Sequence, residues 1–194
     1  GGAKAVKVQL YDPKQFDKPA SHAMEFEELK HLRDFADHHG IALFATPFAT
    51  SFLDWCVKLD LKYMKVAARM HVGFPELTRD IMSLKKPTFV SIPADMSKED
   101  QEKIEIFDYA TYLYCVVKYP TLVEEFEMPD FNNSRFEGVS DHTLGNAAAL
   151  FASAHGATYL EKHFTLRNSF QRNGELAHLC SMTQEDLALI KNTA

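Results

Sequence analysis

Seven short apolar runs, rich in β-branched and aromatic residues, recur along this chain between stretches with helical spacing or helix-capping residues. Such alternation predicts a parallel β-sheet covered by helices, the α/β class. A doubly wound sheet normally has a glycine-rich turn after its first strand, and this chain has none there. The pattern therefore favours a TIM-type (β/α)8 barrel. The expected strands are Ala5–Leu10, Ile41–Thr46, Tyr63–Ala68, Thr88–Ile92, Tyr112–Val117, Glu137–Ser140 and Ala157–His163.

The start of the chain bears on how complete the barrel is. A barrel of this type closes with eight strands, one more than the runs found here. Gly1-Gly2-Ala3-Lys4 leads straight into the first run, with no helix before it. We expect residues 1–194 to form a single, partial barrel domain whose first βα unit is missing. Because an open barrel exposes sheet edges to pairing, we also expect a homo-oligomer, a dimer or larger.

Helices are expected between the strands because apolar residues recur at helical spacing and capping residues stand at their ends. Gly40 and Gly156 follow two of these stretches and suit helix termination. The expected helices are Glu25–His39, Ser51–Leu59, Pro75–Leu84, a helix capped by Ser97, Thr143–His155 and a last helix capped by Thr183. The expected loops are Tyr11–Ala23, Thr121–Arg135 and Arg167–Leu179.

Composition excludes several classes of protein. Hydrophobic residues make up 46% of the chain, enough for a full core, and the net charge of −6 argues against a nucleic-acid surface. No apolar run reaches the roughly 18 residues of a membrane span, and no signal-peptide pattern opens the chain. Cys56, Cys115 and Cys180 share no metal-like spacing and indicate reduced thiols in a cytosolic protein. We therefore expect a cytoplasmic protein that binds neither nucleic acid nor membranes.

Two histidines stand where two neighbouring runs stop. His142 comes just after the sixth run, and His163 ends the seventh. The carboxyl ends of parallel strands converge on one face of the sheet, so two imidazoles can meet over one pocket. Imidazole nitrogens bind manganese-type metals, and an incomplete protein shell leaves room for water or a substrate oxygen. The alternative is a pair of hydrogen-bonded core histidines.

Polar side chains at other strand ends indicate an anionic ligand. Lys7 and Lys65 would each point inward from an apolar strand, and an inward ammonium needs an anionic partner because an unpaired buried charge is costly. Thr46, Ser91 and Ser140 carry hydroxyls that could donate to phosphate oxygens. The alternatives are lysines whose stems reach out to solvent and hydroxyls with no role in binding.

The motifs at these strand ends resemble those of the N-acetylneuraminate (sialic acid) synthases, in the same order along nearly the whole chain. The motifs are Val6-Lys7-Val8-Gln9, Ala45-Thr46-Pro47-Phe48, Tyr63-Met64-Lys65-Val66-Ala67, Tyr119-Pro120-Thr121, Ser140-Asp141-His142-Thr143-Leu144-Gly145 and Glu161-Lys162-His163-Phe164-Thr165. The motifs that begin at Ser140 and at Glu161 are specific to this family, whereas each of the others is weak on its own. The resemblance implies a (β/α)8 barrel that condenses phosphoenolpyruvate with an N-acetylated hexosamine such as N-acetylmannosamine. It also implies a divalent metal, manganese or magnesium, and release of phosphate.

The resemblance assigns a role to each candidate residue. His142 and His163 would bind the metal. The expected catalytic residues are Lys65, Glu161 and Tyr119, of which Tyr119 would lie near the sugar and Glu161 would orient the sugar or the surroundings of His163. The expected substrate-binding residues are Lys7, Thr46, Lys65, Arg69, Ser91, Ser140 and His178. Family members usually add a C-terminal antifreeze-like domain that reaches into the partner subunit's site, and their first strand carries a glutamate important for catalysis.

This chain departs from the family at several positions. Ala68 and Met70 stand where the family has a serine and a glutamate that hold phosphoenolpyruvate and the sugar. Val117 replaces an asparagine, and Ala177 replaces the aspartate before His178. Arg69 adds a cation that can bind a carboxylate or phosphate through a bidentate fork, which would suit a different acceptor.

Three functions follow from these residues. The first is condensation of phosphoenolpyruvate with an aldose-derived acceptor, in the manner of a sialic acid synthase. The second is a catalytically impaired barrel that binds a phospho-ligand or a sugar, or a truncated homologue. The third is a different metal-dependent aldolase. An aldolase of the Schiff-base type would need a desolvated lysine of lowered pKa, and Lys65 or Lys162 would be that lysine.

Overall fold

The computed structural model describes residues 2–170 and 176–193. It divides into two compact units. The N-terminal unit consists of Ala3–Phe89 and Asp108–Ala110. The C-terminal unit consists of Gly1–Gly2, Val90–Phe107 and Thr111–Ala194.

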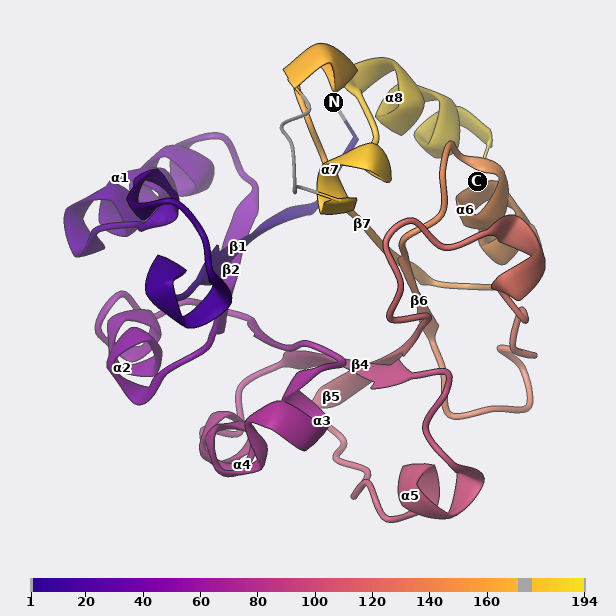
Figure 1. Ribbon diagram of the computed structural model, residues 1–194, viewed down its shortest axis with the longest axis horizontal. Helices are drawn as coiled ribbons and strands as arrows, with labels where there is room; N and C mark the ends of the chain where they lie inside the picture. The colour runs from indigo at the N-terminus through magenta and orange to yellow at the C-terminus, as the bar shows by residue number, and fades with distance from the viewer. Residues whose placement is uncertain (1, 171–175, 194) are drawn as a thin grey trace. The chain divides into compact units, whose positions relative to one another are not determined.

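Three parallel strands in chain order form the sheet of the N-terminal unit: β1 (Ala5–Leu10), β2 (Ala42–Pro47) and β3 (Met64–Val66). Figure 1 shows α1 and α2 on the same side of β1 and β2. The register pairs Lys7 with Phe44 and Ala45 with Met64, which makes Thr46 and Lys65 neighbours at adjacent strand ends. The helices of this unit are α1 (Phe26–His38), α2 (Thr50–Lys58), α3 (Met70–Gly73) and α4 (Pro75–Ser83), with 3-10 turns at Pro13–Phe16 and Ala20–His22.

The C-terminal unit holds the strands that carry the histidines. Its strands follow one another in chain order as β4 (Thr88–Pro93), β5 (Ala110–Cys115), β6 (Gly138–Asp141) and β7 (Tyr159–Lys162), with β4 and β5 beginning in the N-terminal unit. The pairs β5–β6 and β6–β7 are parallel. The helices are α5 (Lys98–Glu102), α6 (Ala147–Ala154), α7 (Leu176–Leu179) and α8 (Gln184–Thr193), with 3-10 turns at Val123–Glu125 and Asn168–Phe170. The expected α/β class, with strands alternating with helices, is confirmed.

Capping residues explain where several helices begin. Ser97 accepts a hydrogen bond from the backbone N–H of Asp100, as expected of the N-cap of α5. Thr183 and Asp186 exchange hydrogen bonds between side chain and backbone at the start of α8, which is a capping box. The helix expected from Ser51 begins one residue earlier, at Thr50, so Ser51 lies inside α2 and the N-cap is Ala49.

Other boundaries differ from the expectation for local reasons. The helix expected from Thr143 begins at Ala147, because the Asp141 carboxylate binds the backbone N–H of Thr143 and holds that segment in a turn. β5 begins and ends two residues earlier than expected. The third strand is shorter than the expected Tyr63–Ala68, because β3 ends at Val66. The four-residue helix α3, which was not expected, begins soon after it at Met70. The expected loops contain short 3-10 turns, and α7 lies within the last of them.

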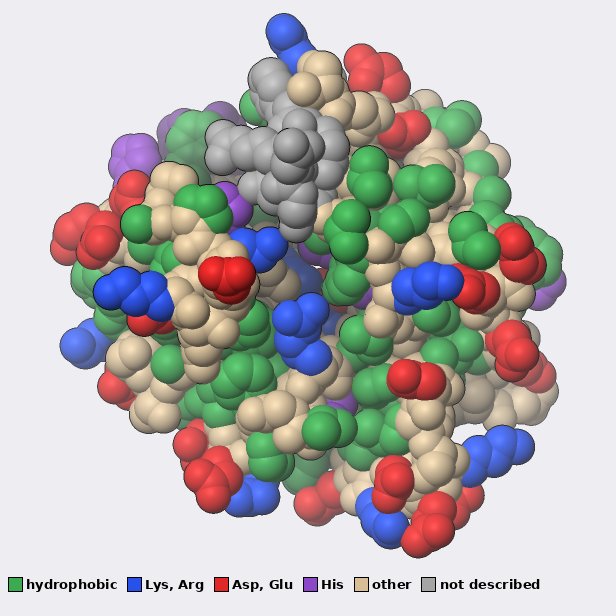
Figure 2. Space-filling model, viewed as in Figure 1, with side chains coloured by type: hydrophobic (Ala, Val, Ile, Leu, Met, Phe, Trp, Pro, Cys, Tyr) green, Lys and Arg blue, Asp and Glu red, His purple; other side chains and the backbone are tan. Residues whose placement is uncertain are grey.

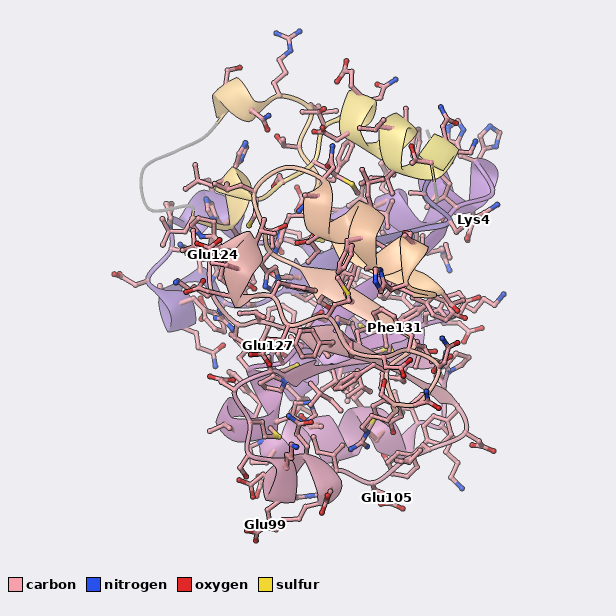
Figure 3. The ribbon with its side chains drawn as sticks, turned by 90° about the vertical axis from the view of Figure 1, so that its right-hand side faces the viewer. Lys4, Glu99, Glu105, Glu124, Glu127 and Phe131 are labelled. Carbon is pink, nitrogen blue, oxygen red and sulfur yellow. The ribbon has the colours of Figure 1, made fainter. Side chains whose placement is uncertain are left out.

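The core of the C-terminal unit includes the connection between β5 and β6. Phe126 from this connection is buried with Val139 of β6 and with Ala148 and Ala152 of α6. Phe131 packs partly buried against the same cluster, and Figure 3 shows Glu124, Glu127 and Phe131 along this connection. A long loop is thereby anchored beside the strand that ends at the histidine motif.

The cysteines are free and buried. Burial raises the pKa of the Cys56 thiol to about 12, and burial also raises the pKa of Cys180. These thiols therefore stay protonated and unreactive near neutral pH.

No helix in the described parts of the chain is long and apolar enough to cross a membrane. On the face drawn in Figure 2, acidic and basic side chains are interspersed over much of the surface.

Candidate active site at the strand ends

The two histidines of the C-terminal unit lie close together. Their ring centroids are 5.5 Å apart, and the ring planes are tilted by 40°. The Tyr119 ring lies 4.1 Å from the His142 ring and 5.8 Å from the His163 ring. The two imidazoles expected at neighbouring strand ends thus lie together, and Tyr119 from the segment after β5 joins them in one aromatic cluster.

The orientation of His142 is set by the backbone around it. Its Nδ1 lies 2.9 Å from the carbonyl oxygen of Val116, and a carbonyl can only accept, so Nδ1 carries the proton. In the neutral ring the lone pair is then on Nε2, the nitrogen with which such a histidine binds metal. The backbone N–H of Thr121 donates to the His142 carbonyl at 2.9 Å. Hydrogen bonds therefore fix both the imidazole ring and the backbone of His142.

The separation of the His142 and His163 rings allows both imidazoles to bind one divalent cation. An imidazole nitrogen binds such an ion at about 2.1 Å, so two rings on one ion have centroids at most about 6.5 Å apart, a limit that the observed separation meets. In the described part of the chain, no group of three or more His, Cys, Asp or Glu side chains is placed to hold a metal. His142 and His163 offer two imidazole nitrogens, and oxygen ligands from water or substrate would complete the shell of an ion bound to both.

A chain of three hydrogen-bonded side chains crosses β4, β6 and β7. The Oγ atoms of Ser91 and Ser140 are 2.6 Å apart, and Ser140 Oγ donates to Glu161 Oε2 at 2.5 Å. With Glu161 ionised, the Ser140 proton points to the carboxylate, so Ser91 is the donor to Ser140. Both hydroxyls were expected as phosphate donors, and in this arrangement both point their protons along the chain toward Glu161.

In the N-terminal unit, a buried hydroxyl and a buried ammonium lie on neighbouring strands. Thr46 is fully buried, and within the described residues its Oγ1 has no hydrogen-bond partner. Lys65 is 1% exposed, and its Nζ donates to the Val66 carbonyl at 3.3 Å. The register places half-buried Lys7 on the same face of the sheet as Thr46. A buried orphan hydroxyl beside a buried cation suits an anionic ligand.

Two expected substrate-binding residues lie elsewhere. Arg69 is exposed and precedes the short helix α3. His178 lies in α7, where its Nε2 is 3.4 Å from the carbonyl oxygen of Arg167, a long contact. Their roles in substrate binding stay predictions.

Lys162 does not suit the Schiff-base role. Its Nζ forms an ion pair with Asp141 Oδ2 at 2.9 Å and donates to the Thr143 carbonyl at 2.8 Å. An ammonium engaged in this way cannot attack a carbonyl carbon. Sequence reasoning missed this pair; the signal was a charged residue next to each histidine within an otherwise buried strand end.

Thr46→Val should raise the free energy of unfolding of the ligand-free protein by about 1 kcal/mol, because it removes a buried hydroxyl without a partner. Urea unfolding would measure it. Thr88→Val is the matched control: Thr88 is equally buried, but its Oγ1 donates to the Lys86 carbonyl at 2.8 Å, so that variant should lose about 1 kcal/mol. Equal losses in both variants would contradict an orphan hydroxyl at Thr46.

The chain is similar to a family of sugar-acid synthases over most of its length. The NeuB family model matches residues 9–194. A pseudaminic acid synthase of Campylobacter jejuni is 27% identical over 202 residues, which cover 88% of this chain and 59% of that protein. An N,N'-diacetyllegionaminic acid synthase of Legionella pneumophila is 29% identical over 188 residues, 85% of this chain and 50% of that protein. The chain thus spans about half to three-fifths of the length of these curated relatives.

Among solved structures, the N-acetylneuraminic acid synthetase of Leptospira borgpetersenii, in complex with citrate, superimposes with a TM-score of 0.85. The match covers 98% of this chain and 72% of that one, at 22% sequence identity. At this identity the likeness bears on the fold, and it agrees with the barrel-type α/β architecture expected from the alternation of strands and helices.

Proposed function

This chain belongs to the NeuB family, and from that premise we propose that it carries the condensing chemistry of a sugar-acid synthase. The donor would be phosphoenolpyruvate and the acceptor an N-acetylated hexosamine. Relatives over most of the chain are synthases of pseudaminic and legionaminic acid, which supports the general class of product. The observation that carries the proposal is the pair of imidazoles held 5.5 Å apart beside Tyr119.

The metal part of the proposal rests on that pair. His142 and His163 would hold a manganese or magnesium ion, His142 through Nε2 because its Nδ1 donates to the Val116 carbonyl. When bound, the ion would supply Lewis-acid polarisation of the acceptor's carbonyl oxygen. Tyr119, packed against the His142 ring, would keep that ring in place and shield it from water.

The anion-binding part of the proposal rests on the N-terminal unit. Lys65 and Lys7 would neutralise the phosphate and carboxylate of phosphoenolpyruvate, and Thr46 would donate its hydroxyl hydrogen to the same ligand. Preorganised charges of this kind usually make the largest contribution to catalysis.

The reaction balances with water as a third reactant. The enol carbon 3 of phosphoenolpyruvate attacks the aldehyde carbon, and the aldehyde oxygen takes a proton. Water adds at carbon 2 and loses one proton, which balances the proton taken up by the aldehyde oxygen. The bond from carbon 2 to the phosphate oxygen then breaks while the new hydroxyl gives its proton to the departing phosphate, which leaves a keto group at carbon 2 and inorganic phosphate. Glu161 would hold one of these protons on its carboxylate, which Ser140 orients through a hydrogen bond to Oε2.

The acceptor is expected to differ from that of a typical family member. Ala68 and Met70 are buried and apolar where the resemblance calls for a serine and a glutamate. Exposed Arg69 between them offers a cation in place of those groups. These residues favour an acceptor that carries a negative charge and needs fewer neutral hydrogen bonds.

His142→Ala should abolish metal-dependent binding of phosphoenolpyruvate. Calorimetric titration of manganese and then phosphoenolpyruvate into the wild type should show both bind, and the variant should lose at least about 100-fold in manganese affinity because one of two imidazole ligands is gone. His155→Ala is the matched control, since His155 is an exposed histidine of the same unit.

Phosphate release with a panel of N-acetylated hexosamines would then identify the acceptor. Failure of the wild type to bind either ligand would overturn the proposal in favour of a barrel that has lost its activity.

A further inference from the structure

The most deeply buried charges of the C-terminal unit lie next to the two histidines. Lys162 Nζ and Asp141 Oδ2 are 2.9 Å apart, and the two side chains are 1% and 0% exposed. The two residues are register partners on β7 and β6. Each directly precedes a histidine of the candidate site, His163 and His142 respectively. The proposed mechanism gives this pair no role.

The pair is part of a larger set of hydrogen bonds that encloses His142. Asp141 Oδ1 accepts from both the backbone N–H and the hydroxyl of Thr143, each at 2.7 Å. Lys162 Nζ also donates to the Thr143 carbonyl at 2.8 Å. Residues on both sides of His142 are therefore tied to one ammonium on the neighbouring strand, which leaves the turn at 141–143 little freedom.

Strand geometry explains how the pair can act on the histidines without touching the ligand. Side chains alternate between the two faces of a strand. Ser140 and Glu161 are register partners joined by a hydrogen bond on one face, and Asp141 and Lys162 are the next partners, on the other. The two histidines come next in the chain, so fixing the ion pair fixes both strand ends from which the imidazoles project.

Stability alone does not account for these charges. A buried ion pair usually contributes no more to folding than an apolar pair of the same volume, because desolvating both ions is costly. An apolar pair could neither accept the two hydrogen bonds of Thr143 nor donate to its carbonyl. The two charges therefore fix the geometry of the turn at 141–143 and of the adjoining ends of β6 and β7.

We infer that Asp141 and Lys162 are positioning residues that hold His142 and His163 at one separation and orientation for a divalent cation. This inference rests on the proposed metal site of the two histidines. It adds a requirement that the proposed function does not include, namely an intact ion pair on the opposite face of β6 and β7.

The test uses the double variant Asp141→Leu/Lys162→Met, which removes both charges and leaves no lone buried ion. The probes are manganese affinity by calorimetry and the visible absorption of bound cobalt(II), which reports the geometry of the ligands. Manganese affinity should fall 10–100-fold, the usual effect of losing groups that orient metal ligands, and the cobalt spectrum should change. Glu99→Gln/Lys103→Met, which removes an exposed ion pair of the same unit, should leave both readouts unchanged.

The outcomes separate this inference from the proposed function. A folded double variant with wild-type manganese affinity and cobalt spectrum overturns the inference, while the metal site itself stands if His142→Ala still abolishes binding. A wild type that binds no manganese overturns both. If the double variant does not fold, the manganese affinity of Thr143→Val tests the inference instead, because this change removes only the hydrogen bond from Thr143 Oγ1 to Asp141. Several-fold weaker manganese binding supports the inference, and unchanged binding overturns it.

Discussion

Gly138→Ala should destabilise the protein by about 3–5 kcal/mol, among the largest effects of any single substitution. Gly138 begins β6, and a Cβ there would lie 1.9 Å from the carbonyl oxygen of Tyr159 on β7 and 2.7 Å from its carbonyl carbon. These are backbone atoms, so the overlap can be relieved only by moving the two strands apart. The same strands carry the ion pair and the histidines, so ligand binding should fall together with stability.

Urea unfolding monitored by circular dichroism would measure the loss. Gly73→Ala is the matched control, because a Cβ at Gly73 meets nothing within 4 Å. That variant should stay within about 0.5 kcal/mol of the wild type or gain slightly from reduced freedom of the unfolded chain. If the two variants were equally stable, the close approach of β6 to β7 would be wrong.

Lys65→Met should weaken phosphoenolpyruvate binding by about 100-fold, or about 2.7 kcal/mol, a typical value for losing a charge-assisted hydrogen bond in a buried site. Lys65 is the largest of the side chains that are less than 2% exposed, and it follows Met64 in β3 beside Thr46. A methionine keeps the length and the apolar stem but removes the positive charge. Manganese affinity should be unaffected if the histidines alone supply the protein's metal ligands.

Lys62→Met provides the matched control, because Lys62 is an exposed lysine three residues earlier and the change in net charge is the same. It should leave the dissociation constant of phosphoenolpyruvate unchanged, as measured by calorimetry at constant manganese and salt. Equal weakening in both variants would mean that net charge attracts the ligand and that Lys65 has no direct contact with it.

Several features of the candidate site were predictable from sequence. His142 and His163 each stand where an apolar run stops, and parallel strands bring such ends together, so a pair of imidazoles was expected and is found. The buried lysine of β3 was expected from its apolar neighbours. These are consequences of periodicity, which depends on residues close together in the chain.

Other features were not predictable from local pattern. The helix expected from Thr143 begins later because a carboxylate two residues before Thr143 captures its N–H. The sequence predicts Ser91 and Ser140 as donors to phosphate, but in the structure their hydroxyls form one hydrogen-bonded series that ends at Glu161. In both cases a carboxylate captures a hydrogen-bond donor that the local pattern assigns to another acceptor. Which acceptor the donor binds depends on the groups that the fold brings near it.

Hydrophobic spacing and capping are local properties, so the sequence predicts the α/β class, the alternation of strands and helices and the approximate place of each strand. Three contacts of the site depend instead on tertiary packing: the ion pair of Asp141 with Lys162, the Val116 carbonyl that sets the proton of His142, and the buried hydroxyl of Thr46. Those contacts join strands and loops far apart in the chain. Their partners follow from register and burial, which no single segment specifies.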